Sequence, residues 1–290
     1  MLRCWGRILT SAKAEASLVT VLLPVNRPPG LLPFAVRSVQ AQTVQAFELF
    51  IVCDGPPRAT VDAAHELAIG DARIRVFDCP KGERNGEVHR HTALQEARGA
   101  FVAQIGDDDF WFPEHLETIA AILTDADFAN VQTTFVDRDG KIDVKVGDMS
   151  LPWMRARMLA DDPHYGFFGP TFAGYRLSAY RGLPEGWSPA PAYLPSDLFM
   201  WRKFLRQDLR FNSSSCTTAL KFHAARREDM TVADRRAENA LWSRRLTDPA
   251  WRERIRADAA TMIPRRWRKL QPAFDAWRIQ HGFAPEEAET

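Results

Sequence analysis

Residues 93–117 read ALQEARGAFVAQIGDDDFWFPEHLE, and this stretch decides the predicted fold. Apolar residues at helical spacing stop at Gly99, a residue type that commonly follows the last turn of a helix. Phe101–Ile105 is a short apolar run typical of a buried strand, and the polar residues 106–109 end it. A second helix is predicted to begin near Pro113 and to run to about Thr124, because proline is favoured in a first helical turn. Helices joined by a strand in this order are typical of an α/β protein.

The residues before this stretch repeat the same alternation. The predicted strands are Leu18–Val25, Phe47–Val52 and Ile74–Cys79, and the predicted helices are Leu31–Ala41, Thr60–Ile69 and Glu87–Arg98. The first strand, LVTVLLPV, is apolar throughout and rich in β-branched residues, which is typical of a strand covered on both faces. Strands separated by helices are joined by right-handed crossovers. The first half is therefore predicted to form a mostly parallel sheet flanked by helices.

The second half of the chain has a less regular pattern. The predicted elements are a hairpin of Asn130–Val136 with Lys141–Val146, a loop-rich segment over 147–193, a helix over Asp197–Arg206, a strand over Leu220–His223 and a helical region over 228–280. The turn Asp137-Arg138-Asp139-Gly140 supports the hairpin, because these residue types favour tight turns.

Composition and charge exclude several classes of protein. The chain has 290 residues, of which 46% are hydrophobic and 26% are charged, so it has the composition of a globular protein and not of a disordered one. Its net charge is +1, which argues against a protein that coats nucleic acid. No apolar run approaches the ~18 residues of a membrane-spanning helix.

The four cysteines and the N-terminal residues bear on where in the cell the protein is located. Cys4, Cys53, Cys79 and Cys216 are far apart in the sequence and form no zinc-binding or disulfide pattern, so a reducing cytosol is expected. Residues 1–17 lack the apolar core of a signal peptide and are interpreted as a leader. The predicted location is cytoplasmic, with peripheral contact to a membrane as a further possibility.

Polar side chains gather where the predicted strands end. Ligands of parallel sheets bind beyond the carboxyl ends of the strands, which here carry Asp54 and the run Asp107-Asp108-Asp109. Three adjacent carboxylates repel one another unless a cation compensates for them. Capping of the next helix explains one aspartate and not three. A site for Mg²⁺ or Mn²⁺, shared with a diphosphate, explains the run better.

Several segments resemble the motifs of family 2 glycosyltransferases, which have the GT-A fold. SVQAQT at the end of the first helix is similar to the family's S-V-x-x-Q-T, FELFIVCDGP to F-E-L-x-V-V-D-D-G-S, and ARGAFVAQIGDDDFW to A-R-G-x-Y-I followed by D-x-D-D-x-W. The resemblance covers about 18–223. It implies a Rossmann-like α/β sheet and a metal-dependent, inverting transfer of a sugar from a nucleoside-diphosphate sugar, expected to be UDP-linked, to a hydroxyl of a carbohydrate or lipid-linked acceptor.

The resemblance also implies roles for individual residues. The implied donor-binding residues are Pro24, Asp54 (nucleotide base), Arg84 (uracil or diphosphate, with Lys81 as an alternative), Arg90 (nucleotide loop) and Asp107 (ribose). Asp108 is the implied ligand of Mn²⁺ or Mg²⁺, and Asp109 caps the next helix or holds a metal-bound water. For Arg84 and Lys81 a solvated loop explains the charges equally well.

Two later segments resemble the acceptor side of the family. PSDLFMWRKF is similar to the acidic motif that opens a helix near the acceptor, which makes Asp197 the implied general base, or an N-cap in the alternative interpretation. ALKFHAARRED is similar to a Y-R-x-H segment, which makes His223 an implied metal ligand or, equally, a packed histidine. Trp111, Trp153, Trp187 and Tyr193 offer flat faces for sugar rings, although burial more often explains such residues.

The sequence departs from the family at several positions, and this keeps rival functions open. Gly106 stands where the family's first acid is found, and Ser196 stands in place of a glutamate, so a non-catalytic protein that binds nucleotide sugars or partners is one alternative. A sugar nucleotidyltransferase needs a glycine-rich loop after the first strand, which VNRPPG at 25–30 is not. A dinucleotide-dependent oxidoreductase needs GxGxxG there, which is absent.

The predicted organisation has three parts: a leader (1–17), a catalytic domain (18–225) and a helical extension (226–290). Within the catalytic domain, 18–125 is the nucleotide-binding half and 126–225 the acceptor half. Residues 221–280 hold 15 Lys and Arg against 8 Asp and Glu, with several tryptophans. Such helices bind an anionic membrane surface or, more commonly, pack their tryptophans on the domain.

Overall fold

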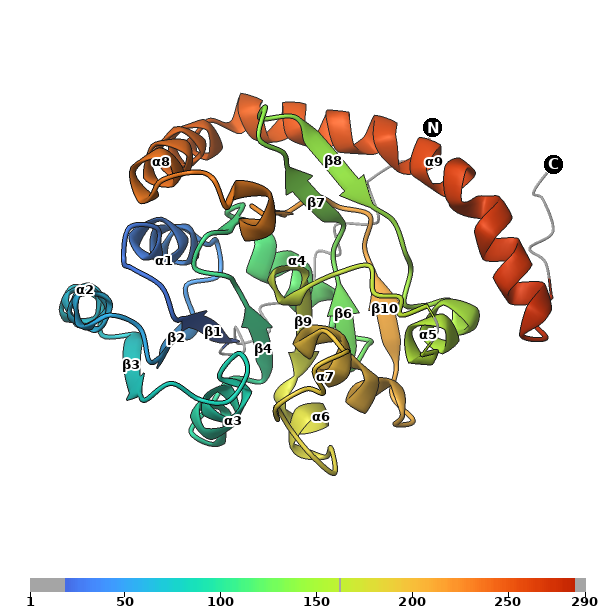
Figure 1. The fold of residues 1–290 in the computed structure, drawn as a ribbon, viewed down its shortest axis with the longest axis horizontal. Helices are drawn as coiled ribbons and strands as arrows, with labels where there is room; N and C mark the ends of the chain where they lie inside the picture. Colours follow the sequence, from blue (N-terminus) through green and yellow to red (C-terminus); the bar gives the residue numbers. More distant parts are fainter. Residues whose placement is uncertain (1–18, 162, 285–290) are drawn as a thin grey trace, which may run out of the picture.

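The structure is a computed structural model, and it describes residues 19–161 and 163–284. The predicted leader 1–17 and the first residue of the predicted first strand lie outside the described residues. A seven-stranded mixed sheet in the order β10-β6-β9-β4-β1-β2-β3 forms the centre of the molecule (Figure 1). Its strands are β1 (Val19–Val25), β2 (Phe47–Asp54), β3 (Ile74–Cys79), β4 (Phe101–Gln104), β6 (Phe128–Asn130), β9 (Ala173–Arg176) and β10 (Phe211–Ser213).

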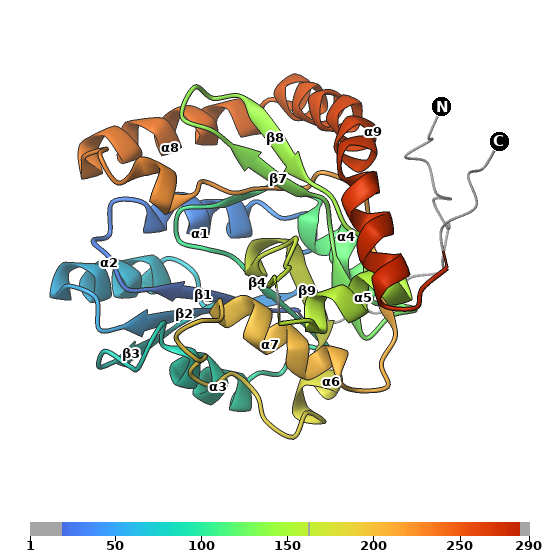
Figure 2. The same ribbon diagram turned by 45° about the vertical axis from the view of Figure 1, so that its right-hand side comes forward.

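Helices cover both faces of the sheet. Figure 2 shows α1 on one side of β1 and β2 and α3 on the other. The helices of the first half are α1 (Leu32–Gln40), α2 (Arg58–Ile69), α3 (Glu87–Gln95) and α4 (His115–Ile122), and those of the second half are α5 (Pro152–Leu159), α6 (Leu177–Arg181), α7 (Ser196–Leu205), α8 (Val232–Thr247) and α9 (Pro249–Gln280). Every residue of β2 is buried, as a strand between two helical layers requires.

The parallel strands bring distant polar residues to one edge of the sheet. β1 pairs in parallel with β2 and with β4, and β2 pairs in parallel with β3. Val25, the last residue of β1, lies opposite Cys53, so Asp54 lies just beyond the end of β1. β4 runs in the same direction, and the aspartates 107–109 follow it. The predicted gathering of acids at one rim is therefore confirmed.

The second half differs from the sequence prediction in four places. The expected strand Asn130–Val136 is two strands, because β6 joins the main sheet while β7 (Thr133–Val136) pairs with β8 (Ile142–Lys145) in the predicted hairpin. The segment 147–193 is not mainly loop, since it holds α5, α6 and β9. The expected strand Leu220–His223 is shifted to β11 (Ala219–Leu220), which pairs with β5 (Phe110–Trp111). The strand β10 was not predicted.

The C-terminal region is helical, as predicted, and it consists of two helices, α8 and α9. α8 lies beside α1, and α9 runs past β8 towards α5 (Figures 1 and 2). The α9 side chain of Phe274 packs on Trp153 of α5, with ring centres 5.3 Å apart. Trp242 and Trp277 are buried, so these tryptophans pack on the domain. Among the helices of the described ranges, none combines the length and apolar character needed to cross a bilayer.

Candidate active site

A cleft of about 200 Å³, here called the acid cleft, opens where β1, β2 and β4 end. The residues that line it include Pro24, Asp54, Arg90, Asp107, Asp108 and Lys221. Five of these were predicted as site residues, and the fold brings all five together. Arg84 was also predicted, but it is exposed, does not line the cleft and points its guanidinium at the Pro191 carbonyl, 3.5 Å away.

A second cleft of about 330 Å³, here called the Asp197 cleft, adjoins the first. The residues that line it include Phe135, Lys145, His164, Asp197, Lys221 and His223. Lys221 lines both clefts, and Ser196, which precedes Asp197 in α7, lines the acid cleft. The two predicted residues of the acceptor side, Asp197 and His223, are therefore neighbours of the predicted donor side.

Asp54 orders the loop that closes one end of the acid cleft. Its carboxylate accepts hydrogen bonds from Lys81 Nζ at 2.6 Å and from the Gly82 N–H at 2.7 Å. Gly86 is the N-cap of α3 and has a φ of +69°, and a Cβ there would lie 2.5 Å from Asp54 Cγ. A glycine is thus required both for the backbone conformation and for the approach of Asp54. Lys81 is held in this loop by the Asp54 contact.

Arginine and lysine side chains compensate for the three aspartates. Arg27 lies between Asp107 and Asp108, with its Nε 3.1 Å from Asp107 Oδ2 and its Nη1 3.0 Å from Asp108 Oδ2. Arg235 of α8 donates to the same Asp108 oxygen at 2.6 Å. Lys221 Nζ lies 3.0 Å from Asp109 Oδ2. Three acids therefore face three basic side chains.

Asp109 has a structural position that the sequence did not predict. It is fully buried and caps no helix, because Glu114 is the N-cap of α4. Its oxygens accept from Phe222 N at 3.0 Å, from Lys221 and from Thr171 Oγ1. These bonds tie the end of β4 to the segment after β11. The position of Asp109 also explains the glycine at position 106, since a Cβ there would lie 2.8 Å from Asp109 Oδ2.

The electrostatic environment shifts the pKa values of the three carboxyl groups in different directions. Burial raises the pKa of Asp107 to about 7, with the charge of Asp108 adding to the rise and Arg27 opposing it. Burial also raises the pKa of Asp109. For Asp108 burial acts in the same direction, but Arg27, Lys221 and Arg235 outweigh it and hold the pKa below its usual value. Asp108 is therefore the aspartate most strongly kept as a carboxylate.

The pKa of Asp107 predicts a pH dependence of stability. Asp107 binds a proton below about pH 7 in the folded state and below about 3.8 in the unfolded chain. A state that holds a proton more tightly loses stability as the pH rises. Relative to Asp107→Asn, which does not titrate, the wild-type free energy of unfolding should fall between about pH 4 and pH 7. Urea unfolding from pH 4 to 8 measures this difference, and a flat difference contradicts the assigned pKa.

Asp197 lies within the first turn of α7 and not at its N-cap, which is Pro195. Its Oδ1 accepts from the Leu198 N–H at 2.8 Å. Burial raises the pKa of Asp197, partly offset by this bond and by Lys221. The N-cap interpretation is thus wrong for this residue. A half-buried carboxylate with a raised pKa, facing a cleft, suits a general base.

His223 stacks on Phe135, with ring centres 4.6 Å apart. Burial, together with Lys221 and Arg226, lowers the pKa of His223 to about 4, so the ring is neutral near pH 7. Within the described ranges no three His, Cys, Asp or Glu side chains group closely enough to hold a metal ion. His223 therefore does not complete a metal cluster with Asp107 and Asp108 in this structure.

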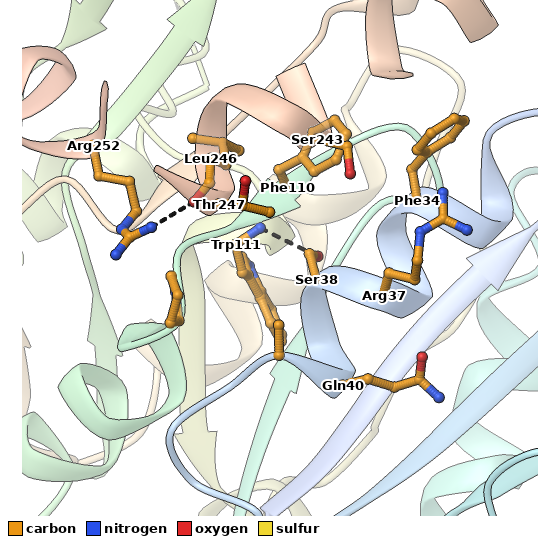
Figure 3. A pocket seen from close by; sticks show the side chains of 12 residues that line it. Phe34, Arg37, Ser38, Gln40, Phe110, Trp111, Ser243, Leu246, Thr247 and Arg252 are labelled. Atoms are coloured by element: carbon orange, nitrogen blue, oxygen red, sulfur yellow. Dashed lines mark hydrogen bonds between the residues drawn. The ribbon is translucent and has the colours of Figure 1, made fainter. Parts of the chain in front are cut away.

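Most of the predicted aromatic platforms are buried. Trp111, Trp153 and Trp187 are each at most 5% exposed, whereas Tyr193 is 69% exposed and stacks on His164. A separate cavity of about 630 Å³ lies between α1, β5 and α8, where Arg252 donates to the Leu246 carbonyl and the Trp111 N–H to Ser38 (Figure 3). Of the residues predicted from the sequence, Trp111 lines that cavity, whereas none of the predicted donor-binding, metal-binding or general-base residues does.

Comparison with known proteins shows the family of the chain and agrees with its fold. The sequence profile of the family described as Glycosyl transferase family 2 matches residues 20–183, more than half of the chain. The chain belongs to this family. It has the GT-A fold that the family resemblance implied.

Three similar proteins illustrate the relationship. The succinoglycan biosynthesis protein ExoW of Rhizobium meliloti is 36% identical over 102 residues, which are 34% of this chain and 31% of ExoW. The structure of S. aureus TarS 1–349 in complex with UDP superposes with a TM-score of 0.56 at 18% identity, over 83% of this chain and 70% of the TarS 1–349 chain. The mannosyltransferase PcManGT of Pyrobaculum calidifontis, in complex with GDP-Man and Mn²⁺, has a TM-score of 0.50 at 16% identity, over 89% and 71% of the two chains. The match to ExoW spans only about a third of that relative.

Proposed function

We propose that this protein transfers a sugar from a UDP-linked nucleoside-diphosphate sugar to a hydroxyl group of a carbohydrate or lipid-linked acceptor. The observation that carries the proposal is the pair of adjoining clefts. One is lined by the acids that follow the parallel strands and the other by a carboxylate suited to take a proton, and they share Lys221. Family membership and the UDP and GDP-Man bound to structures of the same fold support it.

The acid cleft is the proposed donor site. Asp54 is assigned to the nucleotide base, Asp107 to the ribose, and Pro24 and Arg90 to the walls that hold the nucleotide. Arg90 is buried, and it is anchored by a 2.9 Å bond to the Asn85 carbonyl and by its position over the Trp187 ring. It therefore presents a fixed positive charge to the cleft. Arg84 does not line this cleft, and its contact with the donor stays a prediction.

The carboxylates at the acid cleft fit Mg²⁺ or Mn²⁺ on the condition that substrate phosphates supply further ligands. Asp107 Oδ2 is buried and, beyond its ion pair with Arg27, has no hydrogen-bond partner, and Asp108 supplies a second carboxylate beside it. Two carboxylates are too few for a protein-only shell, but Mg²⁺ is commonly held by one or two carboxylates together with substrate phosphates. Asp108 and Asp107 are therefore proposed to hold the ion jointly with the donor. The bound ion would neutralise charge on the departing diphosphate. A metal contact of His223 stays a prediction.

Asp197 is the proposed general base. A sugar hydroxyl is a weak nucleophile near neutral pH, and a carboxylate that takes its proton as the new bond forms accelerates the attack. In the proposed arrangement, an acceptor hydroxyl in the Asp197 cleft attacks the donor in the acid cleft from the side opposite the diphosphate. A single displacement of this kind inverts the anomeric carbon, and the transition state has oxocarbenium character. No covalent nucleophile is required.

The acceptor is proposed to lie over the Asp197 cleft. His164 lines this cleft, and the exposed ring of Tyr193 stacks on it, which provides a flat apolar face of the kind that sugar rings contact. On the outer side of α9, Arg254, Arg265, Arg268 and Lys269 are exposed. Contact of this face with an anionic membrane, near a lipid-linked acceptor, stays a prediction of the sequence.

Thermal unfolding with UDP and Mn²⁺ tests the proposed donor site. UDP with Mn²⁺ should raise the melting temperature of the wild-type protein well above the effect of either alone. Asp108→Asn keeps the shape and removes the charge, so it should weaken Mn²⁺–UDP binding by about 10- to 100-fold or more. Asp125→Asn, at an exposed position on another part of the surface, should bind like wild type.

Turnover separates an enzyme from a protein that only binds nucleotide sugars. A panel of nucleotide sugars is first screened by the same thermal shift, and the best ligand is then tested for release of UDP or GDP with and without hydroxyl acceptors. Release that needs Mn²⁺ or Mg²⁺ supports the proposal. Tight binding of donors with no release across the panel supports the non-catalytic alternative instead.

A further inference from the structure

The C-terminal helical region contributes a side chain to the acid cleft. Arg235 lies in the first turn of α8, and its Nη2 donates to Asp108 Oδ2 at 2.6 Å. Only 12% of this side chain is exposed. Its Nε is buried and has no hydrogen-bond partner. Arg235 thus covers Asp108, the proposed metal ligand, and its Nε–H group remains available for a hydrogen bond.

The start of α8 is built to hold this arginine in place. Thr231 and Asp234 form a capping box, in which Asp234 N donates to Thr231 Oγ1 at 3.1 Å and Thr231 N donates to the Asp234 carboxylate at 3.0 Å. Val232 packs against the loop after β1, because a Cβ at Gly30 would lie 3.1 Å from Val232 Cγ1. That same loop carries Arg27, the second guanidinium on Asp108.

Without a ligand, the acidic and basic side chains paired at the acid cleft are equal in number. Asp107, Asp108 and Asp109 face Arg27, Arg235 and Lys221. A divalent cation alone would add an excess of positive charge to this buried group, and it would have to compete with a guanidinium for Asp108. A diphosphate alone would add an excess of negative charge. Added together, the two cancel, so the cleft favours the metal and the diphosphate as a pair.

We propose that Arg235 and the divalent cation exchange at Asp108, and that the displaced guanidinium then binds the diphosphate of the donor. This inference rests on the proposed function for its metal and its donor. An arginine is suited to bind the diphosphate because the planar N–H groups of its guanidinium match phosphate oxygens. The unused Nε–H adds a hydrogen-bond donor for that contact. The first turn of α8 thereby holds the donor in the cleft once the metal is bound.

The exchange makes the binding of metal and nucleotide strongly cooperative. Metal binding frees Arg235 for the diphosphate, and the diphosphate stabilises the metal, so each raises the affinity for the other by the same factor. A charge-assisted hydrogen bond contributes enough to change UDP affinity by about 10- to 100-fold. Removal of Arg235 should therefore have opposite effects on the two ligands: metal alone binds more tightly, and UDP binds more weakly.

Electron paramagnetic resonance of Mn²⁺, titrated into the full chain with and without UDP, tests the exchange. Wild-type protein should bind Mn²⁺ weakly alone and at least about 10-fold more tightly with saturating UDP. Arg235→Gln should bind Mn²⁺ alone more tightly than wild type and should lose about 10- to 100-fold in UDP affinity with Mn²⁺ present. Arg236→Gln, next to it but exposed, is the matched control and should behave like wild type.

A second variant keeps the test informative if Arg235→Gln folds poorly. Arg235→Lys keeps the charge but loses the planar donors, so Mn²⁺ alone should stay weak while UDP affinity still falls. Equal Mn²⁺ and UDP affinities in Arg235→Gln and Arg236→Gln overturn the exchange but leave the proposed function intact. Absence of any UDP-dependent Mn²⁺ binding in wild type overturns the exchange and also the metal dependence of the proposed function.

Discussion

Replacement of Asp197 by asparagine is expected to reduce sugar transfer by about 10²- to 10⁴-fold, the range that general acid–base catalysis usually contributes. Asparagine keeps the size of the side chain and its ability to accept from the Leu198 N–H. It cannot take a proton from the acceptor hydroxyl. Because Asp197 lines the neighbouring cleft and not the acid cleft, the affinity for Mn²⁺–UDP should stay within about twofold of wild type.

Two measurements on the same protein check this separation: the rate of transfer to a hydroxyl acceptor and the calorimetric affinity for UDP with Mn²⁺. Asp208→Asn, an exposed acid just after α7, is the matched control and should change neither. The raised pKa of Asp197 adds a second check, since wild-type transfer should fall on the acid side as this carboxylate is protonated. Normal turnover in Asp197→Asn, or an equal loss of UDP binding and sugar transfer, contradicts the assignment of Asp197 as the general base.

The first half of the fold could be predicted because its signals are local. β1 and β2 are continuous apolar runs, and each helix between the strands carries its own apolar spacing and end signals. β9 was missed because its sequence, AGYR, is short, contains a glycine and follows a proline-containing turn. Its strand conformation is imposed by antiparallel pairing with β4 and β6, which lie far away in the sequence.

The candidate site shows the same division between local and distant information. Asp54 and Asp108 were predicted to meet because parallel strands carry their ends to one edge. The repulsion among three adjacent acids predicts a compensating cation, but the sequence does not reveal which cation. Arg235 reaches Asp108 across 127 positions of sequence, and Lys221 reaches Asp109 across 112. Arg235 stands beside Arg236 in the basic C-terminal region, and nothing in the sequence marks either arginine for such a contact.

The ion pair of Lys221 and Asp109 gives the largest expected effect on stability. Removal of one partner of a buried ion pair costs about 3–5 kcal/mol because the other charge stays buried and unpaired. Asp109 is fully buried, while Lys221 keeps 25% of its side chain exposed, so Lys221→Met should cost about 3 kcal/mol, near the lower end of that range. Methionine retains the packing of the lysine stem. Urea unfolding at pH 7 measures this loss.

The source of the loss can be separated from a general packing defect in two ways. Burial already raises the pKa of Asp109, and without Lys221 its carboxyl group should take up a proton more readily still. The neutral acid no longer needs a cation, so the cost of Lys221→Met should shrink at pH 5 and grow as the pH rises. In the Asp109→Asn background the same substitution should cost about 1 kcal/mol or less, because no charge is left unpaired. An equal cost in both backgrounds and at both pH values would show that Lys221 stabilises the fold through packing alone, and the charge balance of the acid cleft would then have no part in folding.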